Sequence, residues 1–138
     1  MRFLSRLGSE SSTIDMSCIF CQIPKDRILF ENEFGYAILD GYPVTDYHSL
    51  VIPKRHVEDY FGLTKDELLA ADELIKKLKD FILSKDKSVS GFNIGMNAGE
   101  DAGQTVFHCH IHLIPRRKKD VKEPRGGVRH IIPGKGSY

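Results

Sequence analysis

Short runs rich in β-prone apolar residues occur in several parts of the chain, and the first two such runs lie close together. Residues 27–31 and 36–39 are short and β-prone, and the Asn32-Glu33-Phe34-Gly35 sequence between them is typical of a turn. A third run, His48 to Pro53, follows a turn-like Gly41-Tyr42-Pro43 region. The pattern predicts a β-hairpin followed by a third strand.

The spacing of apolar residues changes to a helical one after this third strand. Thr64-Lys65-Asp66-Glu67 has the form of a capping box, in which the first and fourth residues satisfy each other's backbone N–H groups. The apolar positions that follow at helical spacing are Leu68, Leu74, Ile75, Leu78, Phe81 and Ile82. We therefore expect one long helix that ends at about Ser84, with the lysines at 76, 77 and 79 on its solvent face.

Two more strands are predicted after the helix. Apolar and polar residues alternate over 92–97, and a second alternating run covers 106–114. The residues between them, 98–104, are expected to form a hairpin-like turn. Several strands interrupted by one long helix indicate the α+β class. The expected fold is an antiparallel sheet of about five strands with one long and one or more short helices.

Length and composition limit the number of domains. With 138 residues, of which 41% are hydrophobic, the chain is long enough for one hydrophobic core. We expect a flexible leader at residues 1–15 and a single domain at 16–138 that ends in a basic segment, 116–138. No run reaches the roughly 18 apolar residues of a membrane span, and the start of the chain lacks the apolar stretch of a secretory signal. These features predict a soluble, cytoplasmic protein without membrane contact.

The net charge of +1 conceals an uneven distribution. Residues 116–135 contain eight Lys or Arg against Asp120 and Glu123, a local charge of +6. A basic segment of this kind suits an anionic substrate, although Lys118 and Lys119 are also consistent with a solvated tail. The Arg125-Gly126-Gly127-Val128-Arg129 sequence is more specific, because its two glycines allow the backbone to approach a phosphate closely.

The chain's most informative feature is a run of histidines at every second position: Phe107-His108-Cys109-His110-Ile111-His112-Leu113-Ile114-Pro115. In an extended strand, alternate side chains share a face, so the three imidazoles would line one face and the residues between them would pack on the other. An unperturbed imidazole titrates at about pH 6.5 and can act as nucleophile, proton donor or metal ligand. The pattern favours chemistry at one face of this strand.

Two of the three cysteines, Cys18 and Cys21, form a Cys-x-x-Cys pair. In an intracellular protein this pair indicates a metal half-site or a redox centre rather than a structural disulfide. The following Gln22-Ile23-Pro24 does not resemble the helix start that a redox motif requires. A zinc site needs four ligands, and His56 and one of the three alternate histidines could supply the other two.

Several segments resemble the histidine-triad (HIT) family, a superfamily of nucleotidyl hydrolases and transferases. The segment from Asn97 to Val106 and the three histidines after it carry the most specific part of the resemblance, and 36–40 and 48–56 also look like family segments. One departure is visible, because Asp46-Tyr47 precedes His48 where the family usually has Pro-Gly. The resemblance implies the same α+β fold, usually as a homodimer with a continuous sheet.

The resemblance also implies a zinc site. In the relatives that bind zinc in this way, the ligands are the two cysteines, the histidine that ends the Pro-Lys-x-His segment and the first triad histidine. In this sequence these residues are Cys18, Cys21, His56 and His108. We expect zinc as a structural cofactor.

The middle histidine, His110, corresponds to the family's nucleophile. A neutral imidazole that attacks the α-phosphorus forms a phosphoramidate, and its other nitrogen should then donate a hydrogen bond to a fixed acceptor. The resemblance further suggests that His112 binds a non-bridging phosphate oxygen, that Gln104 and Thr105 contact the phosphates, and that His48 is a fourth active-site histidine.

Contacts to the sugar and the base are expected from residues elsewhere in the chain. Asp40 corresponds to the acidic or amide residue that the family places on the ribose hydroxyls, which suit a carboxylate. Ile19, Phe20 and Ile23 could enclose the base, and a role in the core is equally consistent with their type. Asn97, at the start of the triad motif, is also expected to bind substrate.

The sequence as a whole indicates a hydrolase of adenosine-containing polyphosphates, such as diadenosine tetraphosphate. The basic segment supports a leaving group with several phosphates, and we expect Arg125 or Arg129 to contact the phosphates beyond the α position. One alternative is a nucleoside phosphoramidase, which cleaves an adenylyl-amine bond by the same chemistry. Another is a nucleotide-binding regulatory module without turnover. Nucleic acid is not expected as a partner.

Overall fold

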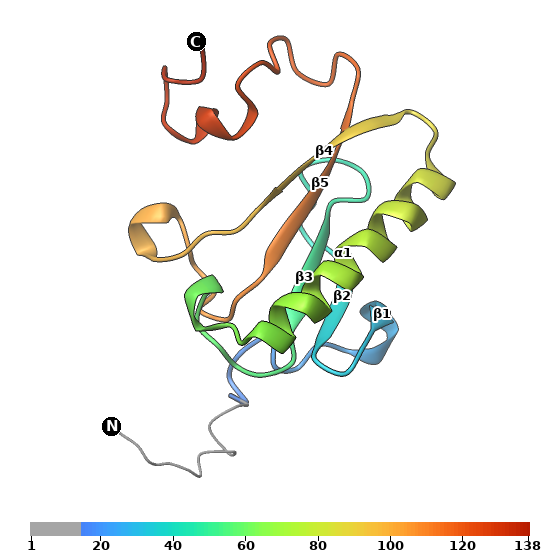
Figure 1. The fold of residues 1–138 in the computed structure, drawn as a ribbon, viewed down its shortest axis with the longest axis vertical. Helices are drawn as coiled ribbons and strands as arrows, with labels where there is room; N and C mark the ends of the chain where they lie inside the picture. The colour runs from blue at the N-terminus through green and yellow to red at the C-terminus, as the bar shows by residue number, and fades with distance from the viewer. Residues whose placement is uncertain (1–14) are drawn as a thin grey trace.

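The computed structural model describes residues 15–138, and its centre is a five-stranded sheet. All neighbouring strands are antiparallel, in the order β1-β2-β3-β5-β4 (Figure 1). Their bounds are β1 Ile28–Glu31, β2 Gly35–Leu39, β3 Ser49–Pro53, β4 Val89–Gly95 and β5 Ile111–Arg117. The predicted α+β class is confirmed. The expected leader, residues 1–15, lies outside the described residues apart from its last position.

The predicted hairpin is present between β1 and β2. The Oδ1 atom of Asn32 accepts hydrogen bonds from the backbone N–H groups of Phe34 and Gly35 and so shapes the turn. A Cβ atom at Gly35 would lie 3.1 Å from Leu74 Cδ1 and 3.2 Å from the carbonyl oxygen of Ile52. Glycine therefore allows the start of β2 to approach the helix closely.

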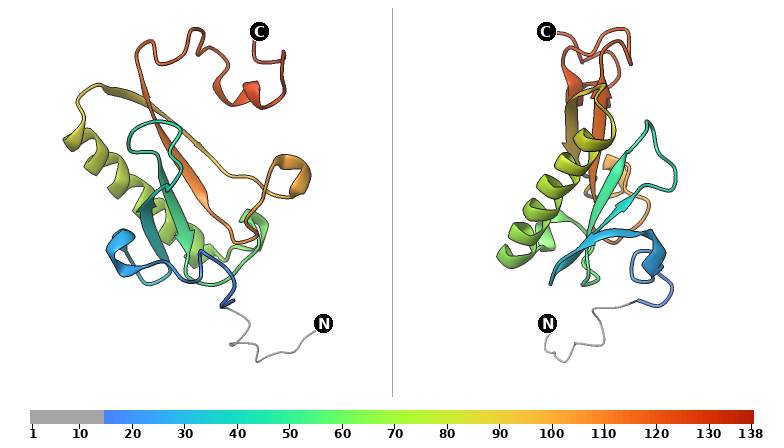
Figure 2. Two further views of the ribbon diagram at one scale, coloured as in Figure 1. Left: turned by 180° about the vertical axis from the view of Figure 1, so that it is seen from behind. Right: turned by 90° about the vertical axis from the view of Figure 1, so that its right-hand side faces the viewer.

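The long helix α1 covers Lys65–Lys85 and begins with the predicted capping box. The Thr64 hydroxyl accepts from the backbone N–H of Glu67, and the Glu67 carboxylate accepts from the backbone N–H of Thr64. Glu67 is only 5% exposed and also receives two hydrogen bonds from the Arg55 guanidinium. The helix lies against one face of the sheet, as Figures 1 and 2 show.

The core consists of two apolar clusters on opposite faces of the sheet. The cluster under the helix contains Ala37, Val51, Leu74, Leu78, Ile82, Val89, Ile111 and Leu113. The cluster on the other face contains Phe20, Ile38, Leu50 and Ile52. Ile111 and Leu113 thus point toward the helix, and His112, which pairs with Leu50 in the register, points to the opposite face. The predicted alternation is confirmed over these three residues.

The predicted fifth strand has the wrong bounds. Strand β5 begins at Ile111 rather than 106 and continues to Arg117, so His108 and His110 lie in the segment that precedes it. The backbone N–H of Cys109 donates to the carbonyl oxygen of Val57, outside the sheet ladder. The connection between β4 and β5 covers residues 96–110 and is therefore longer than the predicted turn at 98–104. Only His112 of the triad belongs to a regular strand.

Short 3-10 helices lie at Lys25–Arg27, Tyr60–Gly62, Glu100–Ala102 and Gly127–Ile131. The last of these belongs to the C-terminal segment, residues 118–138, which extends beyond the end of the sheet (Figures 1 and 2). Several apolar side chains of this segment are exposed, among them Val128 at 59% and Ile131 at 81%.

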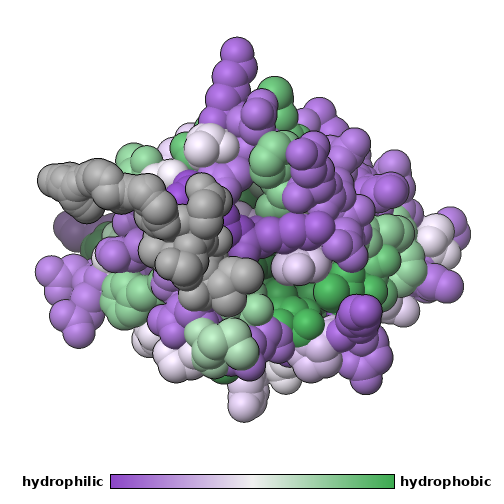
Figure 3. All heavy atoms as spheres, turned by 90° about the horizontal axis from the view of Figure 1, so that it is seen from below, coloured by the Kyte–Doolittle hydropathy of each residue, from purple (hydrophilic) through white to green (hydrophobic). Residues whose placement is uncertain are grey.

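At the opposite end of the molecule, hydrophilic side chains predominate around smaller apolar areas (Figure 3). Among the described residues, no helix is long and apolar enough to cross a membrane.

The packing of α1 on the sheet leads to a stability prediction. Leu78 is fully buried in the cluster under the helix, whereas Leu69 on the same helix is 60% exposed. We expect Leu78→Ala to lower the free energy of unfolding by about 2–5 kcal/mol, because it removes buried methyl groups and leaves a cavity. The control Leu69→Ala should change it by less than about 0.5 kcal/mol. Urea denaturation measures both, and equal losses would contradict the assignment of this helix face to the core.

Candidate active site

The first triad histidine, His108, is fully buried beside the Cys-x-x-Cys segment. Its Nε2–H donates to the carbonyl oxygen of Pro53 at 2.8 Å, so its Nδ1 carries the free lone pair. This Nδ1 lies 3.5 Å from the Sγ of Cys18, 3.5 Å from the Sγ of Cys21 and 3.2 Å from the Nδ1 of His56. The structure therefore brings together the four residues predicted as zinc ligands.

The geometry of this cluster fits a tetrahedral metal ion. Usual zinc bond lengths place two nitrogen ligands about 3.3 Å apart, and a nitrogen and a sulfur about 3.5 Å apart. The observed Nδ1–Nδ1 and Nδ1–Sγ distances at His108 agree with these values, and the four ligand atoms all lie within 4.8 Å of one another. The hydrogen bond to Pro53 orients the His108 ring, as outer-shell acceptors do for metal-binding histidines.

The middle histidine, His110, has one ring nitrogen fixed and the other free. Its Nδ1–H donates to the carbonyl oxygen of His108 at 2.8 Å. The neutral ring then has a bare Nε2, which is the state that a nucleophilic imidazole needs. The ring of Phe20 packs against His110 with a centroid separation of 5.0 Å and limits its rotation.

The third triad histidine, His112, forms a hydrogen-bonded pair with His48. The backbone N–H of Val44 donates to Nδ1 of His48, so the neutral ring of His48 carries its hydrogen on Nε2. That Nε2 lies 2.9 Å from the Nδ1 of His112 and 3.3 Å from the Oδ2 of Asp40. Because His112 accepts at Nδ1, its own hydrogen is on Nε2, from which it can donate to a phosphate oxygen.

Burial sets the charge state of this pair. His48 is 3% exposed, and burial lowers its pKa, an effect that the nearby Asp40 carboxylate partly offsets. Burial also lowers the pKa of His112, and the neighbouring His110 and His48 rings lower it further. Both rings are therefore neutral at neutral pH and can relay a hydrogen bond without carrying charge.

Comparisons with known proteins agree with this arrangement. The HIT domain profile matches residues 22–119. The chain belongs to the HIT family. Its relatives include the adenosine 5'-monophosphoramidase of Saccharomyces cerevisiae, 36% identical over 79% of this chain and 68% of the relative. Another is the asymmetrical bis(5'-nucleosyl)-tetraphosphatase of Schizosaccharomyces pombe, 37% identical over 70% of this chain and 53% of the relative.

A solved structure extends the comparison to the fold and the metal cluster. A zinc-bound histidine triad family protein from Mycobacterium smegmatis matches with a TM-score of 0.68 and 37% identity, over 76% of this chain and 78% of that chain. The family relationship supports nucleotide hydrolase activity for the present HIT protein, and zinc is compatible with its Cys/His cluster.

Two residues of the HIT motif before the histidines have different surroundings. Gln104 is only 3% exposed, and its amide is engaged with three backbone groups: the N–H of Gly99 and the carbonyl oxygens of Glu58 and Val106. Both hydrogens of the amide are used, so this geometry gives Gln104 a role in shaping the loop rather than a direct phosphate contact. Thr105 is exposed and lines a shallow depression next to Cys18.

The predicted base-binding residues divide between core and surface. Phe20 belongs to the buried cluster behind the histidines, and Ile23 packs against that cluster. Ile19 is 63% exposed and remains available to a ligand. The core interpretation therefore holds for Phe20 and Ile23, and the base contact stays a prediction.

A cavity of about 450 Å³ adjoins His48 and His112. The exposed Asn97 lines it, and Gly127, Val128 and Ile131 of the C-terminal segment form part of its wall. Its apolar lining residues are Val44, Ile94, Met96, Ile114, Val128 and Ile131. The C-terminal segment thus borders this cavity through a glycine and two apolar residues, and the contact predicted for its basic residues stays a prediction.

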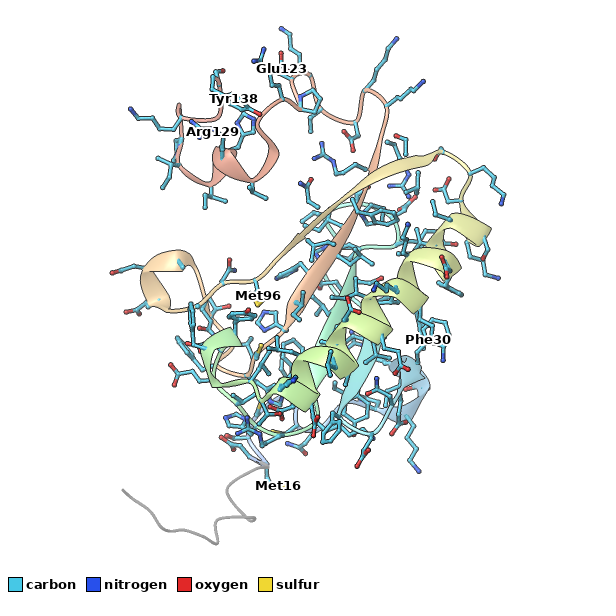
Figure 4. All side chains as sticks on the ribbon, viewed as in Figure 1. Met16, Phe30, Met96, Glu123, Arg129 and Tyr138 are labelled. Carbon is cyan, nitrogen blue, oxygen red and sulfur yellow. The ribbon has the colours of Figure 1, made fainter. Side chains whose placement is uncertain are left out.

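The two arginines of that segment have another environment. The guanidinium carbons of Arg125 and Arg129 lie 5.0 and 4.9 Å from the ring centroid of Tyr138. Figure 4 shows Arg129 and Tyr138 close together in the C-terminal segment, apart from Met96 at the active-site end of β4. Neither arginine is among the residues that line the cavity beside His48 and His112.

Sequence reasoning missed two backbone groups that set the chemistry of the site. The N–H of Val44 fixes the protonated nitrogen of His48, and the carbonyl oxygen of Pro53 does the same for His108. Backbone groups leave no side-chain signal, so no motif could have revealed them.

The Asp46-Tyr47 departure from the family pattern changes the local backbone energy. Tyr47 adopts a φ of 69°, a conformation that glycine adopts freely and that costs another residue about 1–2 kcal/mol.

The lowered pKa values of His48 and His112 predict a pH dependence of stability. The unfolded chain takes up protons as the pH falls through about 6.5, whereas the folded histidines do so only at lower pH. The free energy of unfolding should therefore decrease from about pH 7 to about pH 5.5, with at most about 1.4 kcal/mol per pH unit from each histidine.

Urea denaturation across this pH range measures the effect. Metal ligands add a pH dependence of their own, so the comparison is with His48→Gln, which removes one lowered pKa and should give a shallower slope. The same slope in both proteins would contradict the neutral state assigned to His48.

Proposed function

We propose that this protein hydrolyses adenosine-containing polyphosphates in two steps, through a nucleotidyl group carried on His110. The observation that supports the proposal is the hydrogen bond from Nδ1–H of His110 to the carbonyl oxygen of His108. It leaves a bare Nε2 next to His112, whose ring centroid lies 5.3 Å away. A nucleophile and a hydrogen-bond donor for the same phosphoryl group are thereby neighbours.

In the first step, Nε2 of His110 attacks the α-phosphorus, a P–N bond forms and the P–O bond to the leaving phosphate breaks. The leaving group departs as an anion and takes a proton from solvent. In the second step, water attacks the same phosphorus, the P–N bond breaks and a nucleoside monophosphate is released. His112 donates from Nε2 to a non-bridging oxygen, and this hydrogen bond strengthens as the oxygen gains charge.

Asp40 is the proposed ribose ligand. Its Oδ1 accepts from the backbone N–H of Tyr42 at 2.8 Å, and its Oδ2 lies near His48. The loop therefore fixes the carboxylate at the edge of the active site, where it can accept hydrogen bonds from two adjacent hydroxyls. Ile19 and the edge of Phe20 are the proposed base contacts.

The leaving group distinguishes the two candidate activities. Phosphates beyond the α position would be held by Arg125 or Arg129, as the charge of the C-terminal segment suggests. A phosphoramidase is the second candidate, because the cavity beside His112 has an apolar lining that suits an uncharged leaving group. Of the two relatives named above, the one from Schizosaccharomyces pombe is a tetraphosphatase and the one from Saccharomyces cerevisiae is a phosphoramidase.

Replacement of the nucleophile tests the proposal. His110→Asn keeps a polar side chain but removes the attacking nitrogen, so kcat should fall by at least about a thousandfold, with little change in the affinity for AMP. The assay uses diadenosine tetraphosphate and adenosine 5'-phosphoramidate in parallel. The control is His130→Asn, in the C-terminal segment, which should retain activity. Near-normal turnover by His110→Asn would rule out the nucleotidyl-histidine route.

The same two substrates decide between the candidates. If the polyphosphate is the substrate class, the Arg125→Ala/Arg129→Ala double variant should lose far more kcat/KM on diadenosine tetraphosphate than on the phosphoramidate. Equal losses on both substrates, or a wild-type enzyme that prefers the phosphoramidate, would favour the phosphoramidase.

We propose that Cys18, Cys21, His56 and His108 bind one structural zinc ion. Bound zinc would hold the His108 ring and its carbonyl oxygen in place, and the metal would take no part in the reaction. Protein purified without chelators should contain about one zinc per chain, and Cys18→Ser should lose both the metal and thermal stability. Elemental analysis and a melting curve measure this, with Ser17→Ala as the control. Metal-free protein with a normal melting curve would leave the cysteines as packing residues.

The homodimer and the cytoplasmic location expected from the sequence remain predictions. One feature supports a dimer: β4 is an edge strand whose described partner is β5 alone, and its Ile94 side chain is 52% exposed. A second copy of β4 at this edge would extend the sheet.

A further inference from the structure

Arg117, the last residue of β5, connects three parts of the molecule. Its guanidinium donates to the Thr45 hydroxyl at 2.8 Å and to the carbonyl oxygen of Asp46 at 3.1 Å, both in the loop before His48. It also donates to the Asp86 carboxylate from Nε at 3.2 Å and from Nη2 at 2.9 Å. A lysine could not make these contacts together, because its three donors sit on one nitrogen.

Asp86 gives this arrangement a fixed anchor. It is the C-cap residue of α1, and its other carboxylate oxygen accepts from the backbone N–H and the hydroxyl of Ser88. The bonds from Ser88, with a further contribution from Arg117, lower the pKa of Asp86 to about 2. The carboxylate therefore stays charged at any working pH and ties Arg117 to the end of the helix.

The loop that Arg117 contacts has an unfavourable backbone conformation. Tyr47 has a φ of 69°, in the left-handed region that favours glycine. The backbone N–H of His48 donates to the carbonyl oxygen of Thr45. The Ser49 hydroxyl donates to the backbone carbonyl oxygen of Tyr47. In this conformation the N–H of Val44 reaches Nδ1 of His48 at 3.1 Å.

We propose that Arg117 is a positioning residue for His48: it holds Thr45 and Asp46 so that the N–H of Val44 selects the Nε2–H form of the imidazole. The Nε2–H then points at His112, which in turn keeps its own hydrogen on Nε2. The importance of this positioning for turnover rests on the proposed function. The positioning of His48 itself is a property of the protein without substrate.

Long-range ¹H–¹⁵N NMR on ¹⁵N-labelled protein tests the proposal directly, at a pH where the imidazoles are neutral. The wild-type spectrum should show His48 with a protonated Nε2 and an unprotonated Nδ1. Arg117→Lys keeps the charge opposite Asp86 but loses the contacts to Thr45 and Asp46, so His48 should become a mixture of both forms. Thr45→Val, which removes one acceptor and leaves Arg117 in place, should give a smaller change in the same direction.

Arg116→Lys is the matched control. Arg116 precedes Arg117 on β5 and is paired with Asp120 at 2.8 Å, but the hydrogen bonds of its side chain go to Asp120 and Asn93 rather than to the loop. Its substitution should leave the His48 spectrum unchanged. A rescue variant adds specificity: Tyr47→Gly in the Arg117→Lys background removes the backbone cost and should restore much of the Nε2–H form.

Kinetics separate this proposal from the proposed function. With hydrolysis as the activity, Arg117→Lys should lower kcat by about tenfold and change the affinity for AMP by less than about twofold. An altered His48 form with unchanged kcat would support the positioning by Arg117 and contradict the role of His48 in turnover. A wild-type His48 spectrum in Arg117→Lys, or the same change in Arg116→Lys, would overturn the proposal.

Discussion

The two nitrogens of an imidazole ring are the constraint on which this site depends, because a hydrogen bond at one nitrogen decides what the other can do. His108 donates from Nε2 to Pro53 and presents Nδ1 to the cysteines and His56. His110 donates from Nδ1 to His108 and presents a bare Nε2. His112 accepts at Nδ1 from His48 and keeps a hydrogen on Nε2. Three identical side chains thereby acquire three different chemical roles.

The fold supplies the rigid partners that this arrangement requires. Pro53 ends β3, the fully buried central strand, so its carbonyl oxygen is a fixed acceptor. Ile111 and Leu113 are buried under α1, which forces His112 to the other face of the sheet. The Cys/His cluster and the nucleophile are then linked through one residue, because the carbonyl oxygen that orients His110 belongs to His108. A metal ion at the cluster would stabilise the nucleophile without touching the substrate.

Local sequence signals predicted the parts of this structure that depend on residues close together in the sequence. The capping box at Thr64 and Glu67 and the alternation at Ile111 to Leu113 are short-range patterns, and both are present. The resemblance to the family identified the four residues of the Cys/His cluster, which come from three distant segments. Spacing alone left the choice of histidine open.

What the sequence could not predict depends on backbone groups and long-range contacts. Strand β5 begins late because the N–H of Cys109 donates to Val57, a residue more than 50 positions earlier. The side-chain amide of Gln104 points into the protein because it forms hydrogen bonds with distant and local backbone groups, those of Glu58, Gly99 and Val106. Arg117 is one of several consecutive basic residues in the sequence, and only the fold shows that it reaches the loop before His48.

The central claim is that His110 carries the nucleotidyl group, and mass spectrometry of the enzyme quenched during turnover tests it most directly. The enzyme is mixed with diadenosine tetraphosphate, or with adenosine 5'-phosphoramidate, and stopped under conditions in which a phosphoramidate survives. The account predicts one added nucleoside monophosphate group, located by peptide fragmentation on the imidazole of His110. Product formation without any adduct, or an adduct on another residue, would contradict it.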